Sequence, residues 1–171
     1  KILNSSAGKN GNTPRIKTFS RGTKLVSQIN PKKILKEAYI FNNPVSPHWA
    51  AEKESIKIDP LNLDLPNTND FLIIETAGGL MVPLTRQLLQ IELIKTWQLP
   101  VVLVARTGLG TLNHTLLSLE ALRSRNIKIL GLFLNGPNHE DNPKTLQQFG
   151  DIPIIGQLPF FSDVTSEKLA K

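Results

Sequence analysis

From residue 71 onward, short apolar runs alternate with segments that have the periodicity of a helix. The runs contain few polar residues, as strands do when both faces of a sheet are covered. In the segments between them, large apolar residues recur every three or four residues, which is the spacing of one helix face. The predicted strands are 71–74, 99–105, 127–134 and 153–155, and the predicted helices are 85–97, 111–125 and 143–149. This alternation predicts right-handed crossovers and therefore an α/β fold, a mostly parallel sheet flanked by helices.

The first 70 residues show a weaker pattern. Glycine and proline are frequent near the start, which indicates loops. We predict helices at 23–29 and 31–37. Another helix is predicted from Pro47 to about residue 54, because Ser46 can cap a helix start and Pro47 suits a first helical position. No internal repeat divides the sequence, so we expect residues 1–171 to form a single α/β domain.

Composition narrows the function classes. The 171 residues are 40% hydrophobic and 20% charged, which is typical of one globular domain with a sizeable core. The absence of Cys excludes disulfide scaffolds and thiolate metal sites. No apolar run is long enough to cross a bilayer, and no membrane partner is expected. The net charge of +6 is concentrated in residues 1–57, but no aromatic pattern for base stacking accompanies it. We interpret this charge as a solvated surface and expect no nucleic-acid partner.

Polar and small residues follow the predicted strands at the edge where parallel sheets bind ligands. Glu75 ends the first of these strands and is followed by Thr76, Ala77 and a glycine pair. A carboxylate beside small residues lets a metal ion and phosphate oxygens approach the backbone closely. The alternative is a tight turn that carries an exposed Glu.

Three further segments lie at the same predicted edge. Gly108 and Gly110 precede a helix whose first N–H groups favour an anion such as a carboxylate, although the third glycine of a dinucleotide fingerprint is missing. Asn135 can read a base edge through its donor and its acceptor. The run 156–160 can form a wall for an adenine ring. Taken singly, the first segment is as often a capped helix start, Asn135 is more often part of a turn, and the run 156–160 is more often a strand exit.

Two other kinds of site are not favoured by the sequence. The three histidines, His48, His114 and His139, do not have the spacing of metal ligands. No serine has the glycine neighbours of a hydrolase nucleophile.

In order along the chain, these segments resemble the dethiobiotin synthetase family, which has a P-loop NTPase fold. The family's Glu-Gly-Ala-Gly-Gly segment resembles the run from Glu75, and its Leu-Gly-x-x-Asn-His stretch is similar to 109–114. Asn135 and the run 156–159 fall where the family has its adenine-side Asn and Gly-x-hydrophobic-Pro segment. Upstream, residues 44–48 resemble the family's Pro-x-Ser-Pro-His. Five such segments in the same order are more specific than any one alone.

The resemblance implies an ATP- and Mg²⁺-dependent ligase of biotin biosynthesis, cytoplasmic and homodimeric, that joins CO2 to 7,8-diaminononanoate to form dethiobiotin. By the same resemblance Lys1 is catalytic, and Glu75 is the metal ligand. The implied substrate-binding residues are Ser5, Gly110, Thr111 and Asn113. The implied nucleotide-binding residues are Glu75, Thr76, Ala77, Gly78, Asn135, Gly136, Leu158, Pro159 and Phe160. In the family a second subunit completes the substrate site, and this is the reason to expect a homodimer.

The sequence departs from the family in two ways. A Walker A loop reads Gly-x-x-x-x-Gly-Lys-Ser/Thr, but the Gly8-Lys9 pair is followed by Asn10. We therefore expect the family's first strand, phosphate loop and first helix to be missing, and the 171-residue chain to turn over ATP poorly. Gly22 stands where the family has a second metal-binding Asp. Two alternatives stay open: a non-catalytic remnant of this fold, and another P-loop synthase relative.

Overall fold

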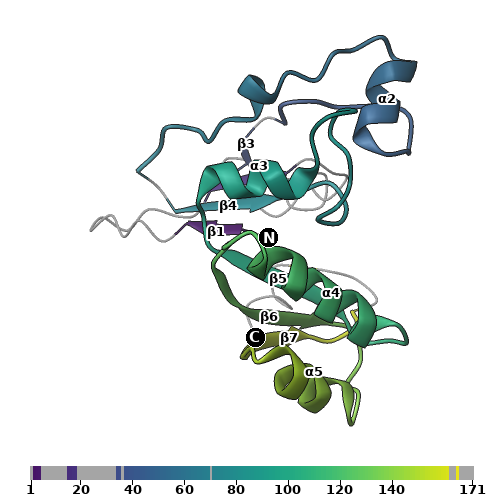
Figure 1. The fold of residues 1–171 in the computed structure, drawn as a ribbon, viewed down its shortest axis with the longest axis vertical. Helices are drawn as coiled ribbons and strands as arrows, with labels where there is room; N and C mark the ends of the chain where they lie inside the picture. Colours follow the sequence, from purple (N-terminus) through teal and green to yellow (C-terminus); the bar gives the residue numbers. More distant parts are fainter. Residues whose placement is uncertain are drawn as a thin grey trace. The chain divides into compact units, whose positions relative to one another are not determined.

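The computed structural model describes residues 2–4, 15–18, 34–35, 37–69, 71–161 and 165. The chain forms two compact units, residues 1–99 and residues 100–171, which are described separately below. Figure 1 shows the helices and strands of both units. The expectation of a single domain stays a prediction. Among the described residues, no helix has both the length and the apolar character that crossing a membrane requires.

The described residues of the first unit form four neighbouring strands of a sheet, in the order β3-β2-β4-β1. Its strands are β1 (Ile2–Asn4), β2 (Arg15–Thr18), β3 (Ile34–Leu35) and β4 (Leu72–Glu75). Strand β2 runs parallel to both of its neighbours, whereas β1 pairs antiparallel with β4. The sheet of this unit is therefore mostly parallel, as the sequence predicts, with β1 as the exception.

One predicted helix of this unit is wrong. Residues 31–37 contain several lysines, which are favourable in a helix. However, Ile34 and Leu35 form β3 beside Ile16 and Lys17 of β2. A two-residue apolar segment gains backbone partners from the neighbouring strand, and that pairing overrides local propensity. The predicted helix at 23–29 lies outside the described residues.

Among the described residues, this unit has the helices α2 (Pro47–Lys53) and α3 (Gln90–Trp97) and the short 3-10 helix η2 (Pro60–Leu63). Helix α3 buries most of its apolar residues, and Trp97 Nε1 donates to the buried carbonyl of Leu63 at 3.1 Å. The prediction placed the start of this helix at residue 85. Thr85 instead forms a turn, in which its hydroxyl accepts hydrogen bonds from the N–H groups of Gln87 and Leu88.

Helix α2 begins as the sequence predicts, with Ser46 at the cap position and Pro47 as the first helical residue. The Ser46 side chain makes no capping hydrogen bond. Two carboxylates of this region fix it to its surroundings instead. Glu52 forms a bidentate pair with Arg86, with both nitrogen–oxygen distances 2.7 Å. Glu54, just after the helix, accepts four N–H groups from Asn42 and Asn43 at 2.8 to 3.2 Å.

The Glu54 contacts predict a pH-dependent stability. Hydrogen bonds from the Asn43 side chain and backbone hold the pKa of Glu54 below its ordinary value. The resulting stabilisation is complete above the ordinary glutamate pKa and is lost as the pH falls through the lowered value. We expect Glu54→Gln to lower the thermal midpoint at neutral pH, with a difference from wild type that shrinks on acidification. Thermal unfolding measured between neutral pH and about pH 3 checks this.

The matched control is Glu120→Gln. Glu120 lies on the exposed face of a helix, and the structure shows no side-chain hydrogen bond for it among the described residues. Its substitution is expected to leave the midpoint unchanged at every pH. A Glu54→Gln effect that stays constant with pH contradicts the assigned role of the carboxylate.

The second unit contains the parallel strands β5 (Val101–Arg106), β6 (Ile129–Asn135) and β7 (Ile154–Leu158), in that order. Helices α4 (Thr111–Arg123) and α5 (Asn142–Gly150) connect them. These elements confirm the predicted alternation, with ends that differ by up to three residues. The two crossovers bring the carboxyl ends of all three strands to one edge, where the predicted ligand-binding segments begin.

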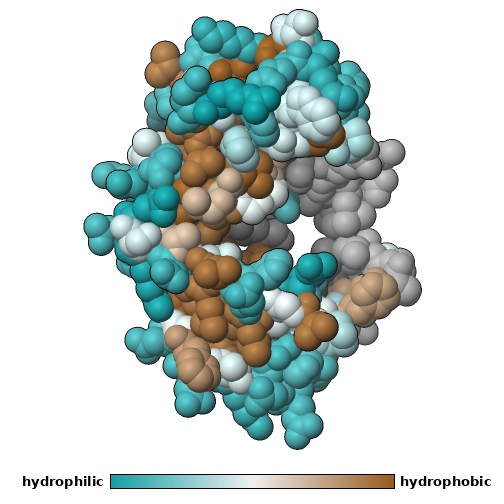
Figure 2. Space-filling view, turned by 45° about the vertical axis from the view of Figure 1, so that its right-hand side comes forward, coloured by the Kyte–Doolittle hydropathy of each residue, from teal (hydrophilic) through white to brown (hydrophobic). Residues whose placement is uncertain are grey.

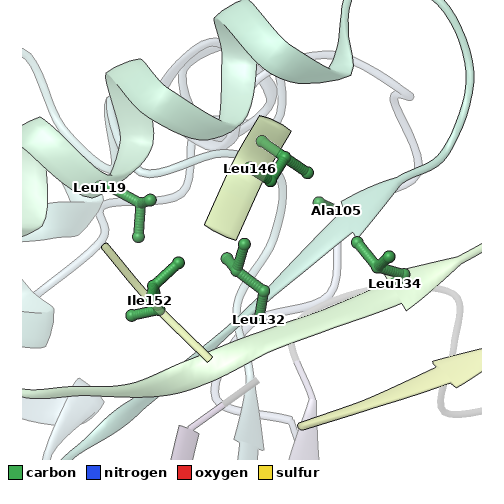
Figure 3. Packing of buried hydrophobic residues seen from close by; sticks show 6 residues of the cluster. All are labelled: Ala105, Leu119, Leu132, Leu134, Leu146 and Ile152. Atoms are coloured by element: carbon green, nitrogen blue, oxygen red, sulfur yellow. The ribbon is translucent and has the colours of Figure 1, made fainter. Parts of the chain in front are cut away.

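A compact apolar cluster holds the second unit together. Figure 3 shows the cluster between α4, α5 and the strands. Its buried members are Ala105, Leu119, Leu132, Leu134, Leu146 and Ile152. Each fully buried leucine contributes about 1.5–3 kcal/mol. On the face shown in Figure 2, apolar side chains also gather at the surface among hydrophilic ones.

Candidate functional site

Glu75 is the last residue of β4. Alternate residues of this strand, Leu72 and Ile74, are buried, and Glu75 is half-buried. Strand β2 pairs with it, placing Thr18 beside Glu75. Within the described part of the chain, the Glu75 carboxylate forms no hydrogen bond or ion pair. A carboxylate at the end of a buried strand is therefore free to bind a cation.

A single carboxylate, such as that of Glu75, is compatible with a magnesium site. The described residues hold no group of three or more His, Cys, Asp or Glu side chains that could bind a metal together. Mg²⁺ does not require such a group, because it is commonly bound through one or two carboxylates plus phosphate oxygens and waters. Glu75 can supply one such ligand.

The loop after Glu75 makes a sharp turn. Gly78 has a φ of +85°, and a Cβ atom there would lie 3.2 Å from Val82 Cγ2. The backbone conformation therefore favours glycine, and a side chain there would press on Val82. Thr76, Ala77 and Gly78 form part of the wall of a cavity of about 810 Å³.

The sequence analysis missed this cavity. Its lining is mostly apolar and includes Leu84, Leu93 and Trp97, together with the stacked rings of Tyr39 and Phe41, whose centroids are 6.2 Å apart. These residues come from segments up to about sixty positions apart, so local pattern carries no signal for it. The volume is in the range of small-molecule sites.

In the second unit, the start of α4 is built around Gly110 and Thr111. Gly110 caps the helix with a φ of +90°, and the Thr111 hydroxyl donates to the carbonyl of Arg106. Thr111 N donates to Gly108 O at 3.2 Å, and His114 N donates to Gly110 O at 3.1 Å. In the described part of the chain this leaves the N–H groups of Leu112 and Asn113 available to an anion.

Gly110, Thr111 and Arg106 line a smaller cavity of about 320 Å³. The sequence analysis did not single out Arg106, although an arginine at a strand end beside glycines was a usable signal. Asn113 is exposed and is not part of this lining. Of the three predicted substrate-binding residues in this segment, Gly110 and Thr111 thus share a cavity wall with Arg106, whereas Asn113 does not.

Asn135 and Leu158 lie side by side at the ends of β6 and β7, as their register shows. Asn135 is exposed, and Gly136 N donates to Leu158 O at 2.9 Å. Pro159 and Phe160 are also exposed. The edge is therefore open to a flat ligand.

Gln157 lies within the run 156–160, but the sequence analysis gave it no role of its own. Its Nε2 donates to Asn138 Oδ1 at 2.7 Å and to Gly136 O at 3.3 Å. These bonds fasten the turn after Asn135 to β7.

The remaining predicted residues are not placed. Lys1, Ser5 and Gly22 lie outside the described residues. Glu75 and its loop belong to the first unit, and Gly110, Asn135 and Leu158 belong to the second. The assignments of all these residues to a shared site stay predictions.

Comparison with known proteins shows which family the chain resembles. A family model described as an AAA domain matches residues 9–168. The ATP-dependent dethiobiotin synthetases BioD of Rhodopseudomonas palustris strain BisA53 and of Brucella ovis are each 44% identical to the chain over 144 residues. A second Rhodopseudomonas palustris relative, from strain HaA2, is 45% identical. Each match covers 84% of this chain and 68% of the relative.

Proposed function

The chain belongs to the dethiobiotin synthetase family, and from this premise we propose that it carries out the ATP-dependent carboxylation and ring closure of 7,8-diaminononanoate to dethiobiotin. The structural observation that most supports this is the carboxylate of Glu75, which has no hydrogen-bond or ion-pair partner among the described residues and lies at the end of a buried strand, before a glycine turn. The parallel strands and flanking helices agree with the P-loop NTPase-like α/β fold of the family.

The reaction has three steps in this proposal. One amine of the substrate adds to CO2 and loses a proton, which gives a carbamate. A carbamate oxygen then attacks the γ-phosphorus of ATP, and ADP leaves. The second amine attacks the carbonyl carbon of the resulting mixed anhydride, closes the ureido ring and expels phosphate. The physical problem is to bring two anions together and to stabilise the charge that develops on the transferred group.

The first unit would handle the phosphate end. Glu75 would hold Mg²⁺, which supplies charge neutralisation for the phosphate oxygens when it is bound. The small residues Thr76, Ala77 and Gly78 let phosphate oxygens approach the backbone. Lys1 would neutralise the carbamate and phosphoryl oxygens, and Ser5 would bind the substrate near its amines.

The second unit would handle the base and the substrate carboxylate. Asn135 would read the adenine edge, with Gly136 in the turn after it and Leu158, Pro159 and Phe160 beside the ring. The helix start at Gly110 and Thr111, with Asn113, would receive the carboxylate.

In this proposal the protein is a cytoplasmic homodimer, in which a second copy of the chain completes the substrate site. Two large apolar side chains of this region support an association surface, because Leu109 is fully exposed and Leu117 is 57% exposed. Analytical ultracentrifugation of the purified protein tests for the dimer.

The direct test of the function is chemical. The purified chain, joined at its start to the phosphate-loop segment of a relative, is incubated with 7,8-diaminononanoate, bicarbonate, ATP and Mg²⁺, and dethiobiotin is measured by mass spectrometry. The chain without that segment is expected to form little. Formation that stops when any one component is omitted supports the proposal. No dethiobiotin, from protein whose folding is verified by circular dichroism, contradicts it and favours a non-catalytic role.

Asn135→Ala tests the base assignment. We expect the dissociation constant for ATP to rise by about tenfold, because a base-edge hydrogen bond is lost, with the thermal midpoint unchanged since Asn135 is exposed. Calorimetric titration with ATP measures it. Asn67→Ala, at an exposed site in the other unit, is the matched control. Equal ATP affinity of the Asn135→Ala variant and wild type removes Asn135 from the site.

A further inference from the structure

A buried glutamine lies directly behind the loop that follows Glu75. Gln90, the first residue of α3, is only 2% exposed. Its side-chain Nε2 donates to the carbonyl of Gly79 at 2.9 Å and lies 3.5 Å from the carbonyl of Gly78. The amide therefore reaches back across the turn to the two glycines of the loop.

A buried amide is costly unless it is hydrogen-bonded, and an apolar side chain of similar volume would fill the same space without that cost. The helix that carries Gln90 is firmly packed, with Ile91 and Ile94 almost fully buried. The loop thus gains hydrogen-bond partners from a rigid element. This favours a role for the Gln90 amide in holding the loop carbonyls.

The backbone around Gln90 strengthens the same attachment. Gln90 N donates to Val82 O at 2.9 Å, and Ile91 N donates to Leu80 O at 2.9 Å. Val82 N donates in turn to Gly79 O at 3.2 Å. The bonds from Gln90 N and Ile91 N use the first N–H groups of α3, which have no partner within the helix.

The attachment binds the carbonyl groups of the loop but not its N–H groups. Gln90 and Val82 hold the carbonyls of Gly78 and Gly79. In the described part of the chain, no backbone hydrogen bond uses the N–H groups of Ala77, Gly78 or Gly79. A run of backbone N–H groups left free is suited to an anion.

We infer that Gln90 is a positioning residue: it fixes the loop 76–79 so that the Glu75 carboxylate and the free N–H groups are preset for the magnesium–phosphate end of ATP. This role rests on the proposed function. It is distinct from the metal-binding role of Glu75, because Gln90 acts through the loop and touches no substrate.

Two variants test the inference. Gln90→Met keeps the approximate volume and removes both donors, and Gln90→Glu keeps the shape and places an acceptor against the Gly79 carbonyl. Gln87→Met is the control, because Gln87 is exposed on the same connection and its side chain makes no hydrogen bond among the described residues.

The first readout is native-state hydrogen exchange. We expect the Val82 and Ile91 amides to exchange at least about tenfold faster in Gln90→Met, and faster still in Gln90→Glu, since the loop loses its partner. The amides of Leu132 and Leu134, in the other unit, serve as the internal reference. Unchanged exchange of the Val82 amide in both variants shows that the Gln90 side chain does not hold the loop.

The second readout separates positioning from stability alone. We expect the MgATP concentration for half-maximal rate to rise by about tenfold in Gln90→Met, with wild-type values in Gln87→Met. Faster loop exchange with wild-type MgATP dependence overturns the positioning role and leaves only a structural one. If the wild-type chain, joined to the phosphate-loop segment of a relative, does not bind MgATP, the proposed function fails and this role fails with it. Hydrogen exchange still decides whether Gln90 holds the loop.

Discussion

We expect Glu75→Gln to reduce Mg²⁺-dependent dethiobiotin formation by at least about 100-fold, while the thermal midpoint stays within about 2 °C of wild type. The loss is expected because a neutral amide oxygen is a much weaker ligand for a hard cation than a carboxylate. The fold is expected to survive because the Glu75 side chain has no hydrogen-bond or ion-pair partner among the described residues.

The measurement is a Mg²⁺ titration of the initial rate for wild type, Glu75→Gln and the control Glu140→Gln, each joined to the phosphate-loop segment of a relative. Glu140 is exposed in the other unit. The control separates the loss of a particular carboxylate from the loss of one negative charge. Wild-type activity of the Gln variant across the titration shows that Glu75 is not the metal ligand, and the site assignment then fails at its centre.

The strands and helices of residues 71–158 were predictable because their hydrophobic pattern is repeated and strong. Apolar runs such as the one before Glu75 became strands, and the leucine stripe of 111–125 became α4. The start of α3 was predicted five residues too early. Leu88 and Leu89 fit the helical spacing, but the Thr85 hydroxyl offers the backbone a turn instead.

The error at 31–37 has a different physical origin. A short segment with lysines has a weak preference for any structure, and the neighbouring strand decides it. Strand β3 pairs with residues nearly twenty positions earlier in the chain, at Ile16 and Lys17. Local propensity contains no information about such a partner.

The candidate site was predictable only as a set of segments. Glycine at 78, 110 and 136 signalled turns, and all three have positive φ. The partners that hold these turns, Gln90 and Gln157, were not recognised because an isolated glutamine has no sequence signature. Their function depends on carbonyl groups 11 and 21 residues away.

We expect the second large effect at Gly136, in the turn at the end of β6. Its φ of +139° is a conformation that side-chain-bearing residues rarely adopt. A Cβ atom there would also overlap the Thr107 hydroxyl. Thr107 is only 3% exposed, and its carbonyl accepts a hydrogen bond from buried Asn142 Nδ2 at 2.8 Å, so it has little room to move away.

Gly136→Ala should therefore lower the free energy of unfolding of the second unit by about 2–4 kcal/mol, as measured by chemical denaturation. Thr107→Ala combined with Gly136→Ala removes the overlap and leaves the backbone cost, so the double variant should recover part of the loss. Gly108→Ala is the control, because a Cβ atom there meets nothing within 4 Å. If Gly136→Ala unfolds at the same denaturant concentration as wild type, the turn has room for a side chain, and the placement of Asn135 against β7 is wrong.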